Sequence, residues 1–201
     1  MNGLQKKWDI IVIGASAGAM PVLQYLCGRL PADLPAVIGV VLHHGSWYGG
    51  NVSEIYGRRG HIAVREAKSG DWLEPGTVYF APSDRHMVFE ATHLRLSRGP
   101  KVHFTRPAID PLFMSAARTF GSRVAGVLLT GGNRDGAHGL VQIRLQGGRT
   151  FVQRPEEATH PTMPLSGLRE DEPEVISTHA LPDVIISLAT GQPDHLVRPN
   201  L

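Results

Sequence analysis

The sequence predicts a single α/β domain built on a doubly wound, mostly parallel sheet, with helices on both faces and a β-hairpin excursion from the sheet. Two observations predict this class. Three runs of branched apolar residues, at 10–13, 36–42 and 124–130, are typical of strands buried on both faces. Helical spacing of apolar residues follows the first and third runs, as in doubly wound folds. The 201 residues suit one domain, over 8–191, with a tail at 192–201.

The first apolar run leads into the turn Gly14-Ala15-Ser16-Ala17-Gly18. Apolar residues then recur at helical spacing: Met20, Val22, Leu23, Leu26 and Leu30. We therefore expect a strand that runs into a glycine-flanked serine, with the serine opening a helix. A serine held there can act as a nucleophile beside an oxyanion site. A turn of this kind also binds phosphates in dinucleotide-binding folds, although their fingerprint G-x-G-x-x-G has glycine where Ser16 stands.

The second apolar run ends at a histidine pair, His43-His44. A dinucleotide-binding fold would have an acid near this position for the ribose hydroxyl. Neighbouring strands of a parallel sheet end at the same edge, so we expect one of these histidines to lie beside Ser16, which favours the nucleophile interpretation. Adjacent strand residues point to opposite faces, and this pattern does not choose between the two histidines.

The middle of the chain predicts short strands and one hairpin. A loop with a short helix is expected over 45–60, and a turn over 70–76. Short strands are expected at 62–66, 77–81, 87–90 and 94–97, the last two forming the hairpin. We interpret His86 and His93 as structural or surface residues.

A second strand-turn-helix unit begins at the third apolar run. A helix over 110–120, with Asp110 and Pro111 in its first turn, precedes it. The strand runs into Gly-Gly-Asn-Arg-Asp-Gly, which places Asp135 at the same sheet edge as Ser16, and a helix over 137–145 follows. The remaining expected elements are a strand at 149–153, an irregular stretch at 155–172 with a short helix from Met163, and a helix at 181–188 that ends at Gly191.

Ser16, His43 and Asp135 thus form a candidate nucleophile, base and acid at one edge of the sheet. A histidine can take the serine proton, and a carboxylate orients the imidazole and stabilises its charged form. Asp135 by itself is also consistent with an Asp-Gly turn, and His43 by itself with a structural histidine at a strand end. The combination with Ser16 is what indicates a catalytic site. The order Ser, His, Asp differs from the order in α/β-hydrolases.

Composition excludes several other classes. The formal net charge of +2 gives no case for nucleic-acid binding. Cys27 is the single cysteine, so no internal disulfide can form, and a reducing cytoplasm fits. No apolar stretch is long enough to span a membrane, and the run at 10–13 is too short for a signal peptide. No H-x-x-x-H or C-x-x-C spacing indicates a metal site.

The chain resembles the chemotaxis protein-glutamate methylesterases, in their CheB effector domain, over about 9–191. The matching segments are VIGASAG, VVLHH, PGTVYFAPSDRH, RPAIDPLFMSAARTFG, GVLLTGGNRDGAHGL, GGRTFVQ and TMP. The resemblance places the family's serine on Ser16, its histidine on His43 and its aspartate on Asp135. Departures border these positions: Ala17 and Ala19 replace threonine and glycine, and Gly132, followed by Asn133, replaces the usual methionine.

The resemblance implies a serine esterase that hydrolyses glutamate γ-methyl esters on a methylated chemoreceptor or similar protein, and it permits glutamine deamidation. The N–H of Ala17 is the candidate oxyanion donor, and we expect no cofactor, no metal, no nucleic acid and no membrane insertion. Only eight residues of the sequence precede the first strand, so we expect the family's receiver domain, and its control in cis, to be absent. Two alternatives remain: an inactive receptor-docking module of the same fold and a nucleotide-binding α/β domain. The sequence leaves the oligomeric state open.

Overall fold

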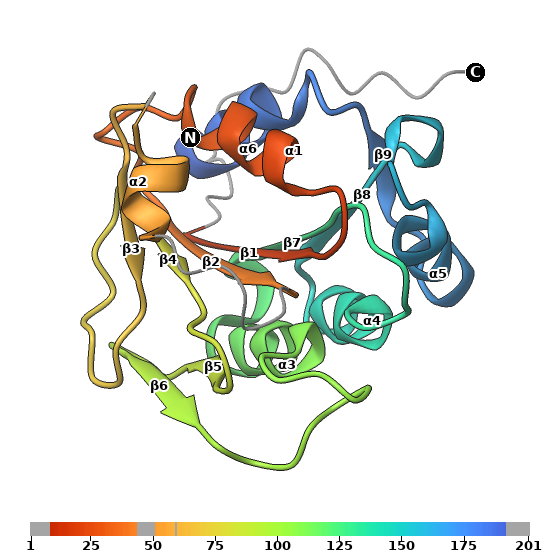
Figure 1. Ribbon diagram of the computed structural model, residues 1–201, viewed down its shortest axis with the longest axis horizontal. Helices are drawn as coiled ribbons and strands as arrows, with labels where there is room; N and C mark the ends of the chain where they lie inside the picture. Colours follow the sequence, from red (N-terminus) through yellow and green to blue (C-terminus); the bar gives the residue numbers. More distant parts are fainter. Residues whose placement is uncertain (1–8, 44–50, 59, 192–201) are drawn as a thin grey trace, which may run out of the picture.

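The computed structural model describes residues 9–43, 51–58 and 60–191, and Figure 1 shows a central sheet between two layers of helices. The strands of the sheet are β1 (Ile10–Ala15), β2 (Val37–Leu42), β3 (Ala63–Glu66), β4 (Thr77–Phe80), β7 (Val124–Leu128), β8 (Arg149–Gln153) and β9 (Glu174–Ile176). The α-helices are α1 (Met20–Cys27), α2 (Val52–Tyr56), α3 (Ile109–Phe120), α4 (Ala137–Leu145), α5 (Thr162–Glu170) and α6 (Leu181–Thr190). Two 3₁₀ turns occupy Gly121–Arg123 and Pro155–Glu157.

The sheet is parallel throughout, in the order β3-β4-β2-β1-β7-β8-β9. The antiparallel pair β5 (His86–Phe89) and β6 (Leu94–Ser97) forms the expected hairpin outside it. β1 lies between β2 and β7, so the chain leaves β1 toward one side and later returns on the other. The carboxyl ends of β1 and its two neighbours therefore flank a topological switch point, where open α/β sheets bind ligands.

Alternate residues of β1 face two separate apolar cores, because successive side chains on a strand point to opposite faces. Ile11 and Ile13 pack with buried residues of α1 and α6 on one face. Ile10 and Val12 pack with residues of α3, α4 and the hairpin on the other. The doubly wound class with helices on both faces is confirmed (Figure 1).

Two expectations need correction. α1 begins at Met20 instead of at Ser16: Gly18 has φ +81°, outside the helical region, and the peptide N–H of Ala19 turns back to the carbonyl of Ser16 at 3.2 Å. The strand β9 was not expected, because its three residues include no apolar run and it pairs only with β8 at the sheet edge. His44 and the tail at 192–201 lie outside the described residues.

The structural role expected for two histidines is confirmed. His86 is buried, its Nε2 lies 2.9 Å from the carbonyl of Pro100, and its Nδ1 accepts the Ala108 N–H at 3.2 Å. His93 pairs with Glu90 at 2.9 Å. Within the described ranges, no helix has the length and apolar character needed to cross a bilayer.

Candidate active site

Three chain segments meet at the carboxyl edge of the sheet. The N–H of Ser16, just after β1, donates to the carbonyl of Thr130 at 3.0 Å. The N–H of His43, just after β2, donates to the carbonyl of Ala15 at 2.9 Å. Parallel pairing thus places the backbone of the candidate nucleophile between that of the candidate base and the end of β7.

Two glycines allow the backbone to close around Ser16. A Cβ at Gly131 would lie 2.9 Å from the Cβ of Ser16 and 2.5 Å from the Cε of Met163. A Cβ at Gly18 would lie 2.5 Å from the Cβ of Thr159, and the left-handed φ of +81° at Gly18 is itself unfavourable for other residues. The turn therefore requires small residues where it contacts the 159–163 segment.

His43 and Asp135, which are 92 residues apart, form the expected pair. Nε2 of His43 lies 2.8 Å from Oδ2 of Asp135, and the two side chains are 9% and 0% exposed. A carboxylate accepts hydrogen bonds, so it holds the imidazole proton on Nε2 when the ring is neutral. Nδ1 of His43 is buried and has no hydrogen-bond partner among the residues that the structure describes. The free lone pair on Nδ1 is the position from which this histidine can accept a proton.

Asp135 is fixed by two backbone donors besides His43. Its carboxylate accepts the N–H of Ile109 at 2.7 Å and that of Asp110 at 3.0 Å, and Thr105 Oγ1 lies 3.4 Å from it. Burial by itself would raise the pKa of Asp135, but the hydrogen bonds from His43, Ile109 and Asp110 outweigh burial and leave this pKa below its usual value. The carboxylate is therefore held ionised at the start of α3, where the helix dipole also favours negative charge.

Sequence reasoning missed the second carboxylate of the site. Asp110 was expected only as an N-terminal signal for its own helix, yet its Oδ1 accepts the N–H groups of Gly136 at 3.1 Å and Gly139 at 2.8 Å. Its Oδ2 lies 3.0 Å from Nε2 of His103. Burial and the neighbouring charge of Asp135 raise the pKa of Asp110 above its usual value. No pattern in the sequence indicates this pairing, because it depends on how α3 and α4 pack.

One group of described residues has metal-ligating atoms within 4.8 Å of one another: His103, Asp110 and Asp135. Their carboxylate oxygens already accept the hydrogen bonds given above. The group is thus a hydrogen-bonded cluster behind the candidate base, and we assign no metal to it.

Ser16 is half-buried, and its hydroxyl makes no hydrogen bond within the described part of the chain. The structure therefore pairs His43 with Asp135 and brings the Ser16 backbone alongside, without a hydrogen bond between Ser16 and His43. Ala17 is exposed in the turn, not in the first turn of α1 as expected. Among the described residues, neither the N–H of Ala17 nor that of Gly132 has an acceptor.

A buried imidazole–carboxylate pair beside a serine, at the switch point of a doubly wound parallel sheet, is an arrangement similar to that of serine hydrolases. A sequence profile described as CheB methylesterase matches residues 11–185. The chain belongs to this family.

Two curated relatives illustrate the match. A protein-glutamate methylesterase/protein-glutamine glutaminase 2 of Anaeromyxobacter dehalogenans is 44% identical over 151 residues, which are 75% of this chain and 44% of that protein. A protein of Leptospira interrogans named putative protein-glutamate methylesterase/protein-glutamine glutaminase is 33% identical over 183 residues, which cover 90% of this chain and 95% of that one. The chain spans less than half the length of the Anaeromyxobacter protein and of several other relatives that it matches.

The fold agrees with a solved member of the family. The crystal structure of the Thermotoga maritima CheB methylesterase catalytic domain superposes with a TM-score of 0.83 at 30% identity, covering 90% of this chain and 98% of that one. This agreement confirms the resemblance inferred from the sequence motifs and favours a hydrolase over a nucleotide-binding domain.

Proposed function

We propose that the protein is a serine esterase that hydrolyses glutamate γ-methyl esters on a chemoreceptor-type protein, with Ser16, His43 and Asp135 as its catalytic residues. The observation that supports it most directly is the orientation of His43. Asp135 binds Nε2, and Nδ1 is left buried at the edge where Ser16 lies, with no hydrogen-bond partner in the described part of the chain. A base needs a free lone pair near the nucleophile, and this orientation supplies one.

The first half of the reaction transfers the acyl group to the serine. Nδ1 of His43 takes the proton of the Ser16 hydroxyl as its oxygen bonds to the ester carbonyl carbon. Asp135 stabilises the positive charge that develops on the imidazole. The tetrahedral intermediate then collapses, the proton passes from Nδ1 to the leaving oxygen, and methanol departs.

The oxyanion of that intermediate needs hydrogen-bond donors that are not already used. We propose the N–H of Ala17 for this role and, because a Cβ at Gly131 would meet the Cβ of Ser16, that of Gly132 as a second donor. Water, activated by His43, then cleaves the acyl-enzyme and releases a glutamate carboxylate. Deamidation of glutamine follows the same steps with ammonia as the leaving group.

An inactive docking module of the same fold is the alternative. It draws support from Gly132 and Asn133, which depart from the family motif. A Cβ at Gly132 meets nothing within 4 Å, so the first atom of a side chain can be introduced there without a clash. The Asn133 side chain accepts the N–H of Asp135 at 3.1 Å and so supports the turn that presents this acid.

The deciding experiment is methanol release from methyl-labelled chemoreceptor membranes, with Ser16→Ala as the comparison. We expect release that depends on Ser16, together with labelling of Ser16 by a fluorophosphonate. Folded protein that does neither, with receptors from several sources, would favour the docking module, and Gly132→Met would then be the first change to test.

The proposal places the protein in the cytoplasm, acting on a methylated sensory protein. Burial raises the pKa of the Cys27 thiol to about 12, so the thiol stays protonated and unreactive at neutral pH.

A further inference from the structure

A tight turn beside the candidate site presents an exposed aromatic side chain. The backbones of Val102 and Thr105 exchange hydrogen bonds of 3.1 and 2.9 Å, and the two residues between them, His103 and Phe104, have φ of 49° and 64°. Residues other than glycine seldom adopt this left-handed conformation. Phe104 is 96% exposed. The chain thus uses an unfavourable backbone conformation to hold a phenyl ring in solvent.

One side of this turn lies beside the candidate catalytic acid, and the other side is bonded to the neighbouring Asp110. Thr105 Oγ1 donates to the carbonyl of Val102 at 2.9 Å and lies 3.4 Å from Oδ2 of Asp135. His103 pairs with Asp110 at 3.0 Å. Asp110 in turn donates its N–H to Asp135 at 3.0 Å. Phe104 is therefore presented from a turn that is hydrogen-bonded to the candidate site.

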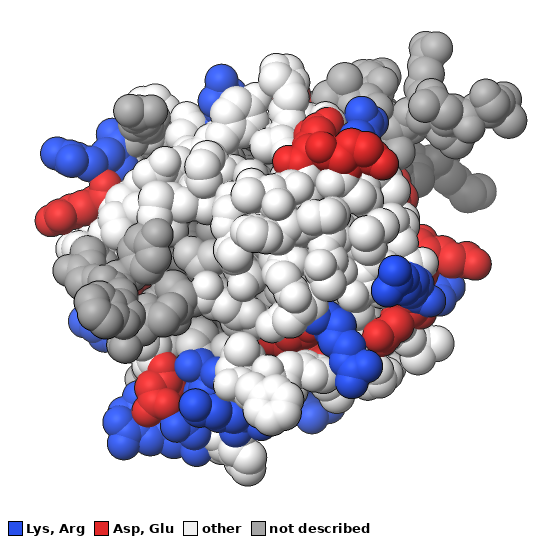
Figure 2. Space-filling model, turned by 45° about the vertical axis from the view of Figure 1, so that its right-hand side comes forward, with Lys and Arg blue, Asp and Glu red and all other residues white. Residues whose placement is uncertain are grey.

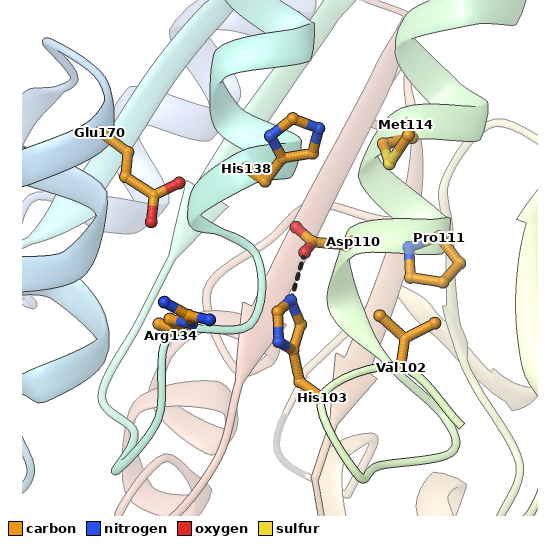
Figure 3. A pocket seen from close by; sticks show the side chains of 8 residues that line it. All are labelled: Val102, His103, Asp110, Pro111, Met114, Arg134, His138 and Glu170. Atoms are coloured by element: carbon orange, nitrogen blue, oxygen red, sulfur yellow. Dashed lines mark hydrogen bonds and ion pairs between the residues drawn. The ribbon is translucent and has the colours of Figure 1, made fainter. Parts of the chain in front are cut away.

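A cavity of about 490 Å³ lies next to the turn (Figure 3). Val102, Pro111 and Met114 form an apolar wall on one side of it, and Arg134 and Glu170 lie across from them (Figure 3). Among the described residues, no carboxylate lies within ion-pair distance of Arg134, which immediately precedes Asp135.

The segment that leads into the turn is basic. Residues 98–106 include Arg98, Lys101 and Arg106 and no acidic residue. Arg106 is paired with Asp84, and Arg98 and Lys101 also lie near that carboxylate. Figure 2 shows Lys and Arg side chains gathered in the lower part of the molecule, where this segment runs in Figure 1.

We propose that Phe104 and Arg134, together the recognition surface, bind an acidic segment of the protein substrate that adjoins the reacting glutamate. Phe104 packs against apolar side chains of that segment, and Arg134 pairs with one of its carboxylates. A protein modified at glutamates supplies such carboxylates. Phe104 follows His103, which lines the cavity together with Arg134, and aromatic and arginine side chains dominate binding hot spots. This inference rests on the proposed esterase function.

The test compares a large substrate with a small one. Phe104→Ala and Arg134→Ala are each expected to raise KM for methylated receptor membranes about tenfold, the effect of losing one hot-spot contact. Hydrolysis of p-nitrophenyl acetate and fluorophosphonate labelling should stay unchanged, because neither probe reaches the recognition surface. Phe104→Trp, which keeps an aromatic ring at this position, should have the wild-type KM for receptor membranes. Added salt should raise the KM of the wild type more than that of Arg134→Ala, because salt screens the ion pair.

Two exposed residues of the same chemical types, outside the turn and the cavity lining, serve as matched controls. Leu145, an apolar residue 69% exposed at the end of α4, and Arg118, exposed in the last turn of α3, are each changed to alanine and should leave both activities unaltered. Equal KM values for wild type, Phe104→Ala and Arg134→Ala with receptor membranes would overturn the inference.

Binding separates this inference from the esterase proposal. If the wild type hydrolyses neither substrate, the esterase proposal fails, and co-sedimentation with receptor membranes still tests the surface. Weaker co-sedimentation of Phe104→Ala and Arg134→Ala than of the two control variants supports the recognition surface, and equal co-sedimentation overturns it.

Discussion

Asp110 and Asp135 cap each other's helices: Asp135 caps α3, which contains Asp110, and Asp110 caps α4, which follows Asp135. Asp135, which precedes α4, accepts the N–H groups of Ile109 and Asp110 at the start of α3. Asp110, in the first turn of α3, accepts the N–H groups of Gly136 and Gly139 at the start of α4. This exchange satisfies donors that helix N-termini leave free and locks the two helices together at the candidate acid.

Asp135→Asn is expected to lower ester turnover about 10³–10⁴-fold, because the amide favours the wrong tautomer of His43. It should also lower the free energy of unfolding at pH 7 by about 1–3 kcal/mol, since charge-assisted hydrogen bonds to the carboxylate are lost. The folded-state pKa of Asp135 is depressed, so its stabilising contribution is present above about pH 4 and disappears as pH falls through the folded pKa.

Urea unfolding at a series of pH values measures this contribution. Asp183→Asn, at an exposed position in the first turn of α6, is the control and should change stability by less than about 0.5 kcal/mol. A stability difference for Asp135→Asn that persists unchanged at pH 2 would contradict the assignment of this pKa.

Asp110→Asn is expected to show the opposite pH dependence. The pKa of Asp110 is raised by burial and by Asp135, so ionising this group costs folding free energy. The unfolding free energy of the wild type, relative to that of Asp110→Asn, should therefore fall as pH rises from about 4 through the folded pKa. The same urea titrations measure it, and a difference that rises with pH would refute the prediction.

The glycines Gly131 and Gly132 should differ sharply in their tolerance of a side chain. Gly131→Ala forces a contact with Ser16 and Met163, so we expect a stability loss of about 1–3 kcal/mol and weaker fluorophosphonate labelling. Gly132→Ala enters open space and should change stability little. Urea unfolding and fluorophosphonate labelling of the two variants, measured side by side, test this prediction. If Gly131→Ala and Gly132→Ala are indistinguishable, Gly131 does not shape the site.

The tautomer of His43 can be observed directly. Because Asp135 binds Nε2, long-range ¹H–¹⁵N spectra at high pH should show Nε2 protonated and Nδ1 bare. Asp135→Asn should alter this pattern. A wild-type ring with its proton on Nδ1 would remove the base from the proposed mechanism.

Most elements could be predicted from the sequence, because they depend on local patterns. The apolar runs of β1, β2 and β7 identify buried strands, and α4 and β8 begin and end where the spacing predicts. The start of α1 was wrong because Gly18 interrupts the helical conformation, and β9 was missed because a three-residue edge strand has too little pattern.

The sequence by itself determined the α/β class and the order of its elements, and it determined that Ser16 and Asp135 each follow a strand end. Only the tertiary structure decided that β1 lies between β2 and β7, that His43 pairs with Asp135 through Nε2, and that Asp110 and His103 stand behind this pair. The physical reason is separation along the chain. Helix and strand periodicity is set by neighbouring residues, whereas a hydrogen bond between residues 92 positions apart depends on strand order and on the packing of α3 against α4.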